Sequence, residues 1–245
     1  MTNDRESLPY RVARAILRPS LTAATTREWQ GQEHLPSGGC VVATNHISHF
    51  DPLTMAHFVN DAGRAPRFLA KAEIFDVPIV GSIVAGAGQI KVERATRDAA
   101  LAFSHAVDAV NAGECVVIYP EGTLTRDREL WPMSGKTGAA RIALTTGCPV
   151  IPVAQWGPQD VLRPYAKRLR LIPRKTMHVH AGPPVDLDSL RGEPVTADVL
   201  RGATTLIMDA ITALLAEIRH AAPPAERYDH RQLRPGRRPD ERWSS

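Results

Sequence analysis

Cysteine is scarce in this chain of 245 residues, and its three copies are far apart in sequence. Cys40, Cys115 and Cys148 each fall in or beside an apolar run. None of the spacings between them is typical of a zinc site or a disulfide framework. We therefore expect three buried, reduced thiols and a protein that works in the cytoplasm.

Aromatic residues and long apolar runs are also few. Aromatic content is 5%, and no nucleic-acid recognition motif is present, so we expect no nucleic-acid partner. No run reaches the ~18–20 apolar residues that cross a bilayer, and the nearest approach, residues 77–90, is short and rich in glycine. The N-terminus lacks the pattern of a signal peptide. The sequence thus predicts a protein that does not span a membrane, with a mildly basic net charge of +4 that suits anionic lipid or phosphate.

The most informative stretch is Thr-Asn-His-Ile-Ser-His-Phe-Asp-Pro at residues 44–52. A strand-like run at 39–43 leads into it, and an apolar segment leads out. Asp51 suits a helix N-cap and Pro52 the first helical position, so a helix is expected to start here. His46 and His49 then lie in a short turn between a buried strand and a helix, a usual place for functional side chains.

Three interpretations of this turn remain open. Asp51 can hydrogen-bond one nitrogen of His46 and leave the other for substrate, which is the base and its orienting partner of a hydrolytic triad without the serine. Alternatively, Asp51 is only a helix cap and His46 a satisfied polar residue. In the third interpretation, His46, His49 and Asp51 bind a metal ion.

Strand-like and helix-like patterns alternate along the chain, which favours an α/β fold: a single domain with a largely parallel mixed sheet flanked by helices. We expect a helical segment in residues 1–26, a main domain in 27–220 and a disordered Pro- and Arg-rich tail in 221–245. Leu8 to Ala24 predicts an amphipathic helix, which either lies at a membrane interface or packs on the core with its arginines in solvent.

Four blocks in this order resemble those of the glycerolipid acyltransferases, the 1-acylglycerol-3-phosphate acyltransferase family. The first is His46 followed by Asp51 five residues later. The second is Gly88-x-Ile90-x-Val92-x-Arg94, the third is Pro-Glu-Gly-Thr at 120–123, and the fourth is Val-Ile-Pro-Val at 150–153. The resemblance covers residues 29–186 and implies the glycerolipid acyltransferase fold.

By this resemblance, His46 and Asp51 are the catalytic pair and a further set of residues binds the polar substrate. That set is Arg94, Glu121, Gly122, Thr123, Lys71, Lys136 and Arg126. The family's arginine in the second block binds the phosphate of the acceptor, as a guanidinium can through two parallel hydrogen bonds. Family members often carry arginine directly after the threonine of the third block, whereas this chain has Leu124 there and Arg126 two residues later.

The resemblance implies an O-acyltransferase that moves a fatty acyl group from acyl-CoA or an acyl carrier protein to the sn-2 hydroxyl of 1-acylglycerol-3-phosphate. Another lysophospholipid or a glycolipid acceptor fits the same chemistry. The thioester is a cosubstrate, and no metal or other cofactor is expected. The expected place of action is the inner face of the plasma membrane, with peripheral attachment. A metal-dependent hydrolase and a non-catalytic membrane-binding module are the other two classes considered.

Overall fold

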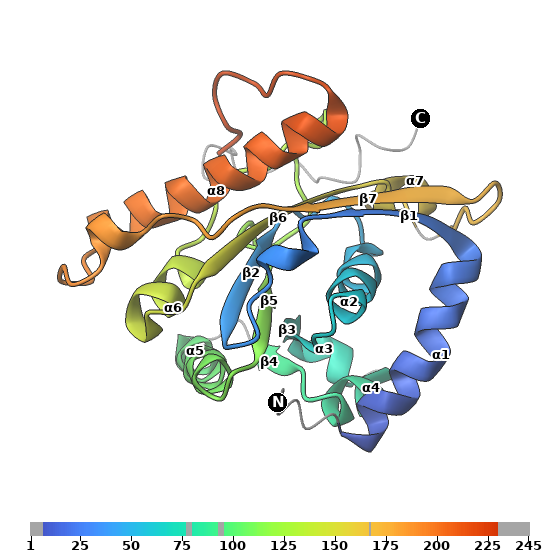
Figure 1. Ribbon diagram of the computed structural model, residues 1–245, viewed down its shortest axis with the longest axis horizontal. Coiled ribbons are helices and arrows are strands. Elements are labelled where there is room, and N and C mark those ends of the chain that lie inside the picture. The colour runs from blue at the N-terminus through green and yellow to red at the C-terminus, as the bar shows by residue number, and fades with distance from the viewer. Residues whose placement is uncertain (1–6, 77–79, 93–95, 167, 230–245) are drawn as a thin grey trace.

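A computed structural model describes residues 7–76, 80–92, 96–166 and 168–229. Its centre is a seven-stranded sheet (Figure 1). The strands are β1 (Thr25–Gln30), β2 (Cys40–Thr44), β3 (Pro66–Lys71), β4 (Ile90–Val92), β5 (Cys115–Ile118), β6 (Val150–Trp156) and β7 (Lys175–Ala181). Across the sheet they follow the order β1-β7-β6-β2-β5-β3-β4.

Most of the sheet is parallel. Strands β4, β3, β5, β2 and β6 run in one direction. Strand β7 pairs antiparallel with β6, and β1 follows β7, so the last two strands run the other way. The prediction of a largely parallel mixed sheet is confirmed. The carboxyl ends of β2, β5 and β6 meet at one edge, where ligands bind in open α/β sheets.

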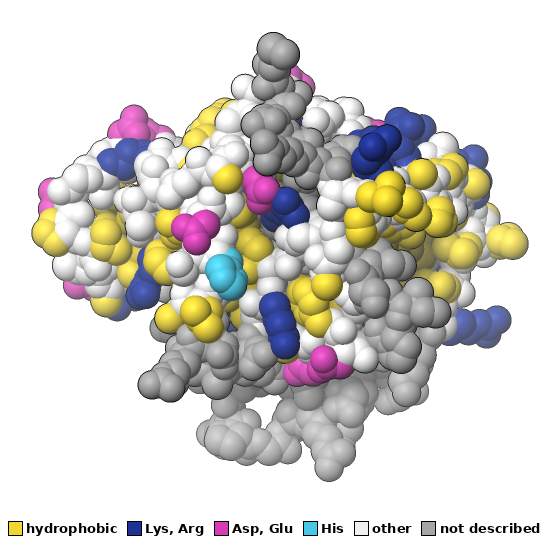
Figure 2. Space-filling view, turned by 90° about the horizontal axis from the view of Figure 1, so that it is seen from below, with side chains coloured by type: hydrophobic (Ala, Val, Ile, Leu, Met, Phe, Trp, Pro, Cys, Tyr) yellow, Lys and Arg dark blue, Asp and Glu magenta, His cyan; other side chains and the backbone are white. Residues whose placement is uncertain are grey.

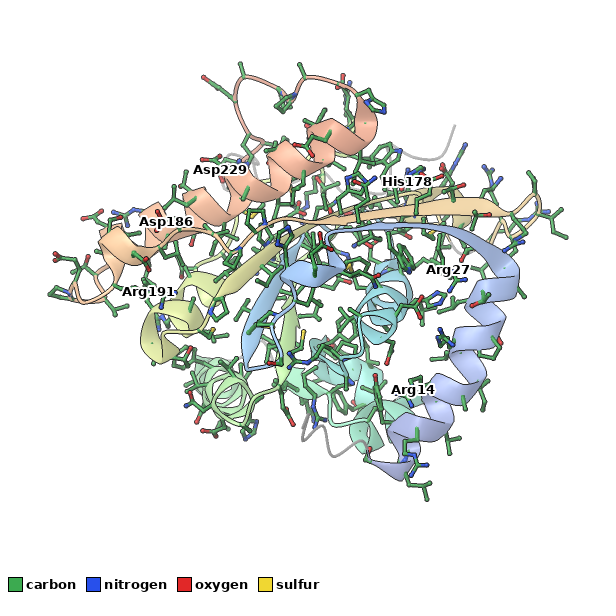
Figure 3. All side chains as sticks on the ribbon, viewed as in Figure 1. Arg14, Arg27, His178, Asp186, Arg191 and Asp229 are labelled. Carbon is green, nitrogen blue, oxygen red and sulfur yellow. The ribbon has the colours of Figure 1, made fainter. Side chains whose placement is uncertain are left out.

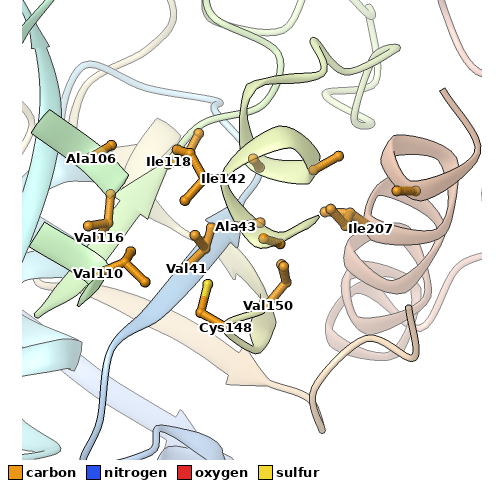
Figure 4. Close-up of a cluster of buried hydrophobic side chains, with 14 of the residues drawn as sticks. Val41, Ala43, Ala106, Val110, Val116, Ile118, Ile142, Cys148, Val150 and Ile207 are labelled. Atoms are coloured by element: carbon orange, nitrogen blue, oxygen red, sulfur yellow. The ribbon is translucent and has the colours of Figure 1, made fainter. Parts of the chain in front are cut away.

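Helices cover both faces of the sheet. They are α1 (Leu8–Ala24), α2 (Asp51–Asp61), α3 (Ala72–Phe75), α4 (Val80–Gly86), α5 (Thr96–Asn111), α6 (Gly138–Thr146), α7 (Pro158–Val161) and α8 (Ala197–Arg219), with 3₁₀ turns η1 (Gln32–His34) and η2 (Asp188–Leu190). Side chains of α5, α6 and α8 form the larger core with Val41, Val116 and Val150 (Figure 4). Helix α2 covers the opposite face. Covered on both sides, β2 is buried throughout and carries mostly apolar residues.

By length and composition alone, helix α8 could cross a membrane. The segment 77–90 is therefore not the nearest approach to such a span. In the structure, however, one face of α8 is part of the core, with Leu200, Ile207, Ile211 and Leu215 almost fully buried. Burial of this face accounts for part of the apolar composition of α8.

Helix α1 packs beside α2 and α4 (Figure 1). Tyr10 is buried and donates a hydrogen bond to Asn60, and Arg18 pairs with Asp61 at 2.9 Å. Asp61 also pairs with Arg27, which is labelled in Figure 3. Packing on the core, one of the two alternatives expected for α1, holds for only part of the helix, because most of its aliphatic side chains face solvent. The exposed ones are Leu8 (71%), Val12 (52%), Ile16 (62%) and Leu17 (40%).

The two expected segment boundaries, after residues 26 and 220, can be compared with the structure. The expected boundary after residue 26 falls inside β1. In the segment expected to be a disordered tail, residues 221–229 are described and residues 230–245 lie outside the described part. Within 221–229, the carbonyl of Tyr228 accepts a hydrogen bond from the Ser134 amide, and Arg227 pairs with Asp209 on α8.

Candidate active site

The site forms where three neighbouring strands end. The turn after β2 contains His46, and the turn after β5 contains Glu121. The two turns are joined directly, since the Thr125 amide donates to the His46 carbonyl at 2.7 Å. Asn45 links the first turn to β6 by exchanging side-chain and main-chain hydrogen bonds with Gln155. Both turns are thus fixed on strands that are buried in the core.

The side chains of His46 and Asp51 form a hydrogen-bonded pair. Asp51 Oδ2 lies 2.8 Å from His46 Nδ1 and accepts backbone hydrogen bonds from Ile47 (2.6 Å) and Ser48 (2.9 Å). The expectation that Asp51 is the N-cap is wrong: Asp51 is the first residue of α2, and Phe50 precedes it without a side-chain cap. The carboxylate turns back toward the histidine because three donors converge on it there. This geometry matches the base-and-orienter interpretation.

Burial acts on the charge of this pair. Asp51 is fully buried, which raises the pKa of its carboxyl, while the hydrogen bonds from His46, Ser48 and Ile47 oppose that shift. The His46 side chain is 16% exposed. Its Nε2 has no hydrogen-bond partner among the described residues. One imidazole nitrogen is therefore held by Asp51 and the other is left for a ligand.

Tyr119 completes the surroundings of the imidazole. Its ring stacks on that of His46, with centroids 4.2 Å apart and planes at 26°. Burial and the nearby Asp51 carboxylate raise the pKa of the Tyr119 hydroxyl, so it stays protonated. The stack limits rotation of the imidazole, which fixes where Nε2 points.

The buried carboxyl group of Glu121 links the two turns. It is 1% exposed; Oε1 accepts the His46 amide hydrogen at 2.9 Å and Oε2 accepts that of Met133 at 3.0 Å. Burial is the largest cause that raises the pKa of Glu121 to about 8, and the Asp51 charge adds to it. Through Oε1, Glu121 thus contacts the backbone of the His46 turn, and through Oε2 it contacts the backbone at Met133.

Gly122 and Lys136 lie against each other at the mouth of the site. Gly122 adopts a left-handed backbone (φ 70°), which favours glycine. A Cβ at this position would lie 2.7 Å from Lys136 Nζ, so a larger residue would displace the lysine side chain from its place against the turn. Lys136 is exposed, and its amide donates to the Pro120 carbonyl at 2.8 Å. The Lys136 ammonium group is thus held beside the third block, residues 120–123.

The remaining predicted binding residues are placed less fully. Thr123 is half-buried in the turn, and Arg126 is half-buried with its Nε lacking a partner among the described residues. Leu124 is only 3% exposed, so the position where relatives often carry arginine faces the core. Arg94 lies outside the described residues. Lys71 ends β3, and its side chain is not described.

The metal-site interpretation finds no ligand set in the described part of the chain. His49 is exposed, and no group of three or more His, Cys, Asp or Glu side chains there is arranged to hold an ion. His178, labelled in Figure 3, pairs with Glu28 on the neighbouring strand at 2.8 Å. The three cysteines are free and buried, as expected.

Sequence reasoning missed Tyr119 and Gln155 as parts of the site. Gln155 was detectable as the one strongly polar side chain in the apolar run of β6, because a buried polar group needs a partner. Tyr119 had a weaker signal, an aromatic residue at the end of a buried strand. Neither stands near His46 in sequence, and only the sheet order brings them there.

A family model described as "Acyltransferase" matches residues 26–156, which is more than half of the chain. The chain belongs to the acyltransferase family. The matched residues include the His46–Asp51 turn and the Glu121 turn described above. The prediction from the sequence blocks is therefore confirmed at the level of the family.

Named acyltransferases are among the relatives of this family member. It is 32% identical over 136 residues to the chloroplastic 1-acyl-sn-glycerol-3-phosphate acyltransferase BAT2 of Brassica napus, covering 54% of this chain and 38% of that protein. A 1-acyl-sn-glycerol-3-phosphate acyltransferase of Borreliella burgdorferi is 27% identical over 159 residues, covering 64% and 60%. The chain thus matches less than two thirds of the length of these relatives.

A solved structure shows the same fold. The crystal structure of the 1-acyl-sn-glycerophosphate acyltransferase PlsC from Thermotoga maritima superposes with a TM-score of 0.68, over 87% of this chain and 81% of that one. Sequence identity is 21%. The likeness supports the sheet and helix arrangement of this acyltransferase domain.

The Glu121 carboxyl makes stability depend on pH. Its pKa in the folded protein is about 8, against 4.5 ordinarily, so between these values the folded chain holds a proton that the unfolded chain has lost. Stability from this group is therefore lost as pH rises through that window. We expect the free energy of unfolding of the wild type to fall more steeply from pH 5 to pH 8 than that of Glu121→Gln.

Urea unfolding at several pH values measures this difference. In Glu121→Gln, an NH₂ group replaces one accepting oxygen. One backbone N–H is then left without a partner, which lowers the free energy of unfolding by about 1–3 kcal/mol. The variant is thus less stable at pH 5, and the gap narrows toward pH 8. A gap that stays constant or widens with pH contradicts the proton assigned to Glu121.

Proposed function

We propose that this protein transfers a fatty acyl group from an acyl thioester to the sn-2 hydroxyl of 1-acylglycerol-3-phosphate. The observation that carries the proposal is the His46–Asp51 pair, with one imidazole nitrogen held by a buried carboxylate and the other without a partner among the described residues. No serine or cysteine takes part in this pair, so the nucleophile is the substrate's own hydroxyl. The names of the relatives in Brassica and Borreliella support the acceptor.

The reaction needs one proton acceptor in the protein. His46 Nε2 takes the proton of the acceptor hydroxyl as its oxygen attacks the thioester carbonyl carbon. The new C–O bond forms a tetrahedral intermediate, which collapses as the C–S bond breaks. The thiolate leaves with the electron pair and takes up the proton from the imidazolium. Asp51 keeps Nδ1 protonated, so that Nε2 is the basic nitrogen, and stabilises the imidazolium.

The polar end of the acceptor is assigned to the third block. The Lys136 ammonium lies against Gly122, and the adjacent Glu121 accepts the His46 amide hydrogen. Lys136 has no ion pair among the described residues. A cation at this point suits a phosphate monoester. Arg94 and Lys71 are assigned to the same phosphate by the resemblance to the family, with Thr123 and Arg126 as further contacts.

Acylation of an acceptor panel tests the proposal. Purified protein with a long-chain acyl-CoA, or with an acyl carrier protein as donor, is expected to acylate 1-acylglycerol-3-phosphate. We expect kcat/KM for 1-acylglycerol-3-phosphate to exceed that for lysophosphatidylcholine or monoacylglycerol on the order of tenfold or more. One charge-assisted contact to phosphate is worth about 1.5–3 kcal/mol. Lys136→Gln is expected to reduce that preference mainly through KM, with Lys175→Gln on β7 as the matched control.

A second acceptor class is favoured by one specific observation. Leu124 is buried where relatives often carry arginine, so one phosphate-binding cation of the third block is missing. A lysophospholipid with a larger head group, or a glycolipid, needs fewer cations there. Equal turnover of 1-acylglycerol-3-phosphate and the uncharged acceptor would support this class and remove Lys136 from the phosphate role.

The lipid acceptor also implies a place of action. We assign the protein to the inner face of the plasma membrane, attached peripherally, because the acceptor and product are lipids and the three thiols are free. The exposed aliphatic side chains of α1, together with the exposed Arg11, suit an anionic lipid surface.

A further inference from the structure

An exposed loop, residues 162–174, joins α7 to β7 and carries three exposed aliphatic side chains in its second half. We call these the aliphatic tip: Leu169 (52% exposed), Leu171 (38%) and Ile172 (93%). The tip is held against the end of α7, because the Arg170 amide donates to the Val161 carbonyl at 2.8 Å. An isoleucine left almost fully in water gains nothing for folding, since it buries no apolar area.

Within the loop itself, all charged side chains are basic. The sequence from 161 to 185 contains no aspartate or glutamate. Arg163, Arg168 and Arg170 are exposed there, and none of them has an ion pair among the described residues. A surface that combines unburied aliphatic groups with unneutralised arginines is complementary to an anionic phospholipid leaflet.

The loop lies at the edge of the sheet that holds the active site. Near its start, the Leu162 carbonyl accepts a hydrogen bond from Ser48 Oγ, in the same turn as His46, at 2.6 Å. Near its end, Arg174 donates to the carbonyls of Thr22 and Thr25, at 2.7 Å each, where α1 meets β1. Each end of the loop is thus fixed, one to the catalytic turn and one to the end of α1.

The tip and α1 lie on the same side of the molecule. In Figure 1 the loop before β7 projects beside the end of α1, away from α6 and the start of α8. Seen from below, hydrophobic side chains gather with Lys and Arg on that side (Figure 2). The exposed aliphatic residues of α1, among them Val12 and Ile16, contribute to this surface.

We propose that the aliphatic tip inserts into the acyl region of an anionic phospholipid bilayer, with Arg168 and Arg170 at the headgroups. The catalytic turn then lies next to the membrane surface, and a lyso-lipid reaches His46 without passing through water. This inference rests on the proposed function, because a lipid acceptor is what makes such a position useful. It adds a second insertion point to the surface of α1.

A fluorescent label reports insertion directly. The native cysteines are at most 7% exposed, so an environment-sensitive dye attaches selectively to Ile172→Cys. With vesicles of equal parts phosphatidylglycerol and phosphatidylcholine, the dye is expected to shift to the blue and brighten. Val195→Cys is the matched control: Val195 is 48% exposed in the loop before α8, on the other side of Figure 1, and its dye should not change. An unchanged signal at position 172, with the protein bound, overturns the proposal.

Vesicle binding gives the size of the contribution. Ile172→Ser is expected to weaken partitioning to the same vesicles about tenfold, since it removes a buried aliphatic group. Arg168→Gln and Arg170→Gln should each weaken it about fivefold, and only on vesicles with phosphatidylglycerol. Val195→Ser should leave binding unchanged. Equal binding of Ile172→Ser and the wild type contradicts insertion.

Short-chain, water-soluble substrates separate this inference from the proposed function. On a short-chain lyso-lipid and thioester in solution, Ile172→Ser should turn over like the wild type, whereas on vesicle-bound acceptor it should be slower. Loss of turnover on both substrates contradicts the insertion role. If the dye signal shows insertion but the protein transfers no acyl group to any acceptor, the membrane contact stands. The proposed function is then refuted.

Discussion

His46→Ala is expected to lower kcat for acyl transfer by about 10²–10⁴-fold, the range that a positioned general base contributes. The hydroxyl of the acceptor is a weak nucleophile at neutral pH, and His46 Nε2 is the only basic atom that the structure places free at the centre of the described site. Binding of the acceptor uses other groups, so KM should change little. Steady-state kinetics of purified variants measure both values.

His49→Ala is the matched control for this prediction. His49 lies in the same turn but is exposed, whereas His46 is stacked on Tyr119 and bonded to Asp51. The control should keep its activity within about threefold, as expected for a surface position away from the reacting atoms. Comparable losses in the two variants, restored by a divalent metal ion, would instead support the metal-site interpretation. Imidazole added to His46→Ala should recover part of the rate, because Tyr119 and Asp51 still line the space.

The order of helices and strands was predictable from residue patterns, whereas several contacts were not. Strand β2 is apolar because both of its faces are covered, and such a run signals a buried strand. The reversed direction of β1 and β7 leaves no local mark in the sequence. The buried face of helix α1 could not be read from hydrophobicity either. Tyr10 and Leu21 are its only buried side chains, whereas the more hydrophobic Ile16 faces solvent.

The His46–Asp51 pair shows which part of the site the sequence alone could not decide. The spacing from His46 to Asp51 was compatible with a helix cap and with a bonded pair, because both structures place aspartate at a helix start. Only the fold of the turn decides, and it turns the carboxylate back to two backbone amides and the imidazole. Glu121 lies 75 residues from His46 in sequence, so its bond to the His46 amide depends on the pairing of β2 with β5.

Asp51→Asn is expected to lower kcat by about 10–10²-fold, less than Asp51→Ala. All three donors converge on Oδ2, while Oδ1 is buried without a partner among the described residues. An asparagine can therefore place its oxygen at the Oδ2 position and keep the three hydrogen bonds, with its amide where Oδ1 was. What it loses is the negative charge, and a hydrogen bond to a charged group is worth about 1.5–3 kcal/mol, or about 10–10²-fold in rate.

Asp51→Ala removes the acceptor altogether and should cost about 10³–10⁴-fold, because Nδ1 and two buried backbone amides lose their partner and the imidazole is no longer oriented. The alanine variant should also unfold at lower urea concentration, whereas the asparagine variant should remain close to the wild type in stability. Kinetics and urea unfolding of the two variants side by side separate charge from orientation. If asparagine lowers kcat as much as alanine does, the amide has turned its nitrogen toward His46 and fixed the wrong tautomer. If neither variant loses activity, Asp51 only shapes the turn and the proposed base acts without it.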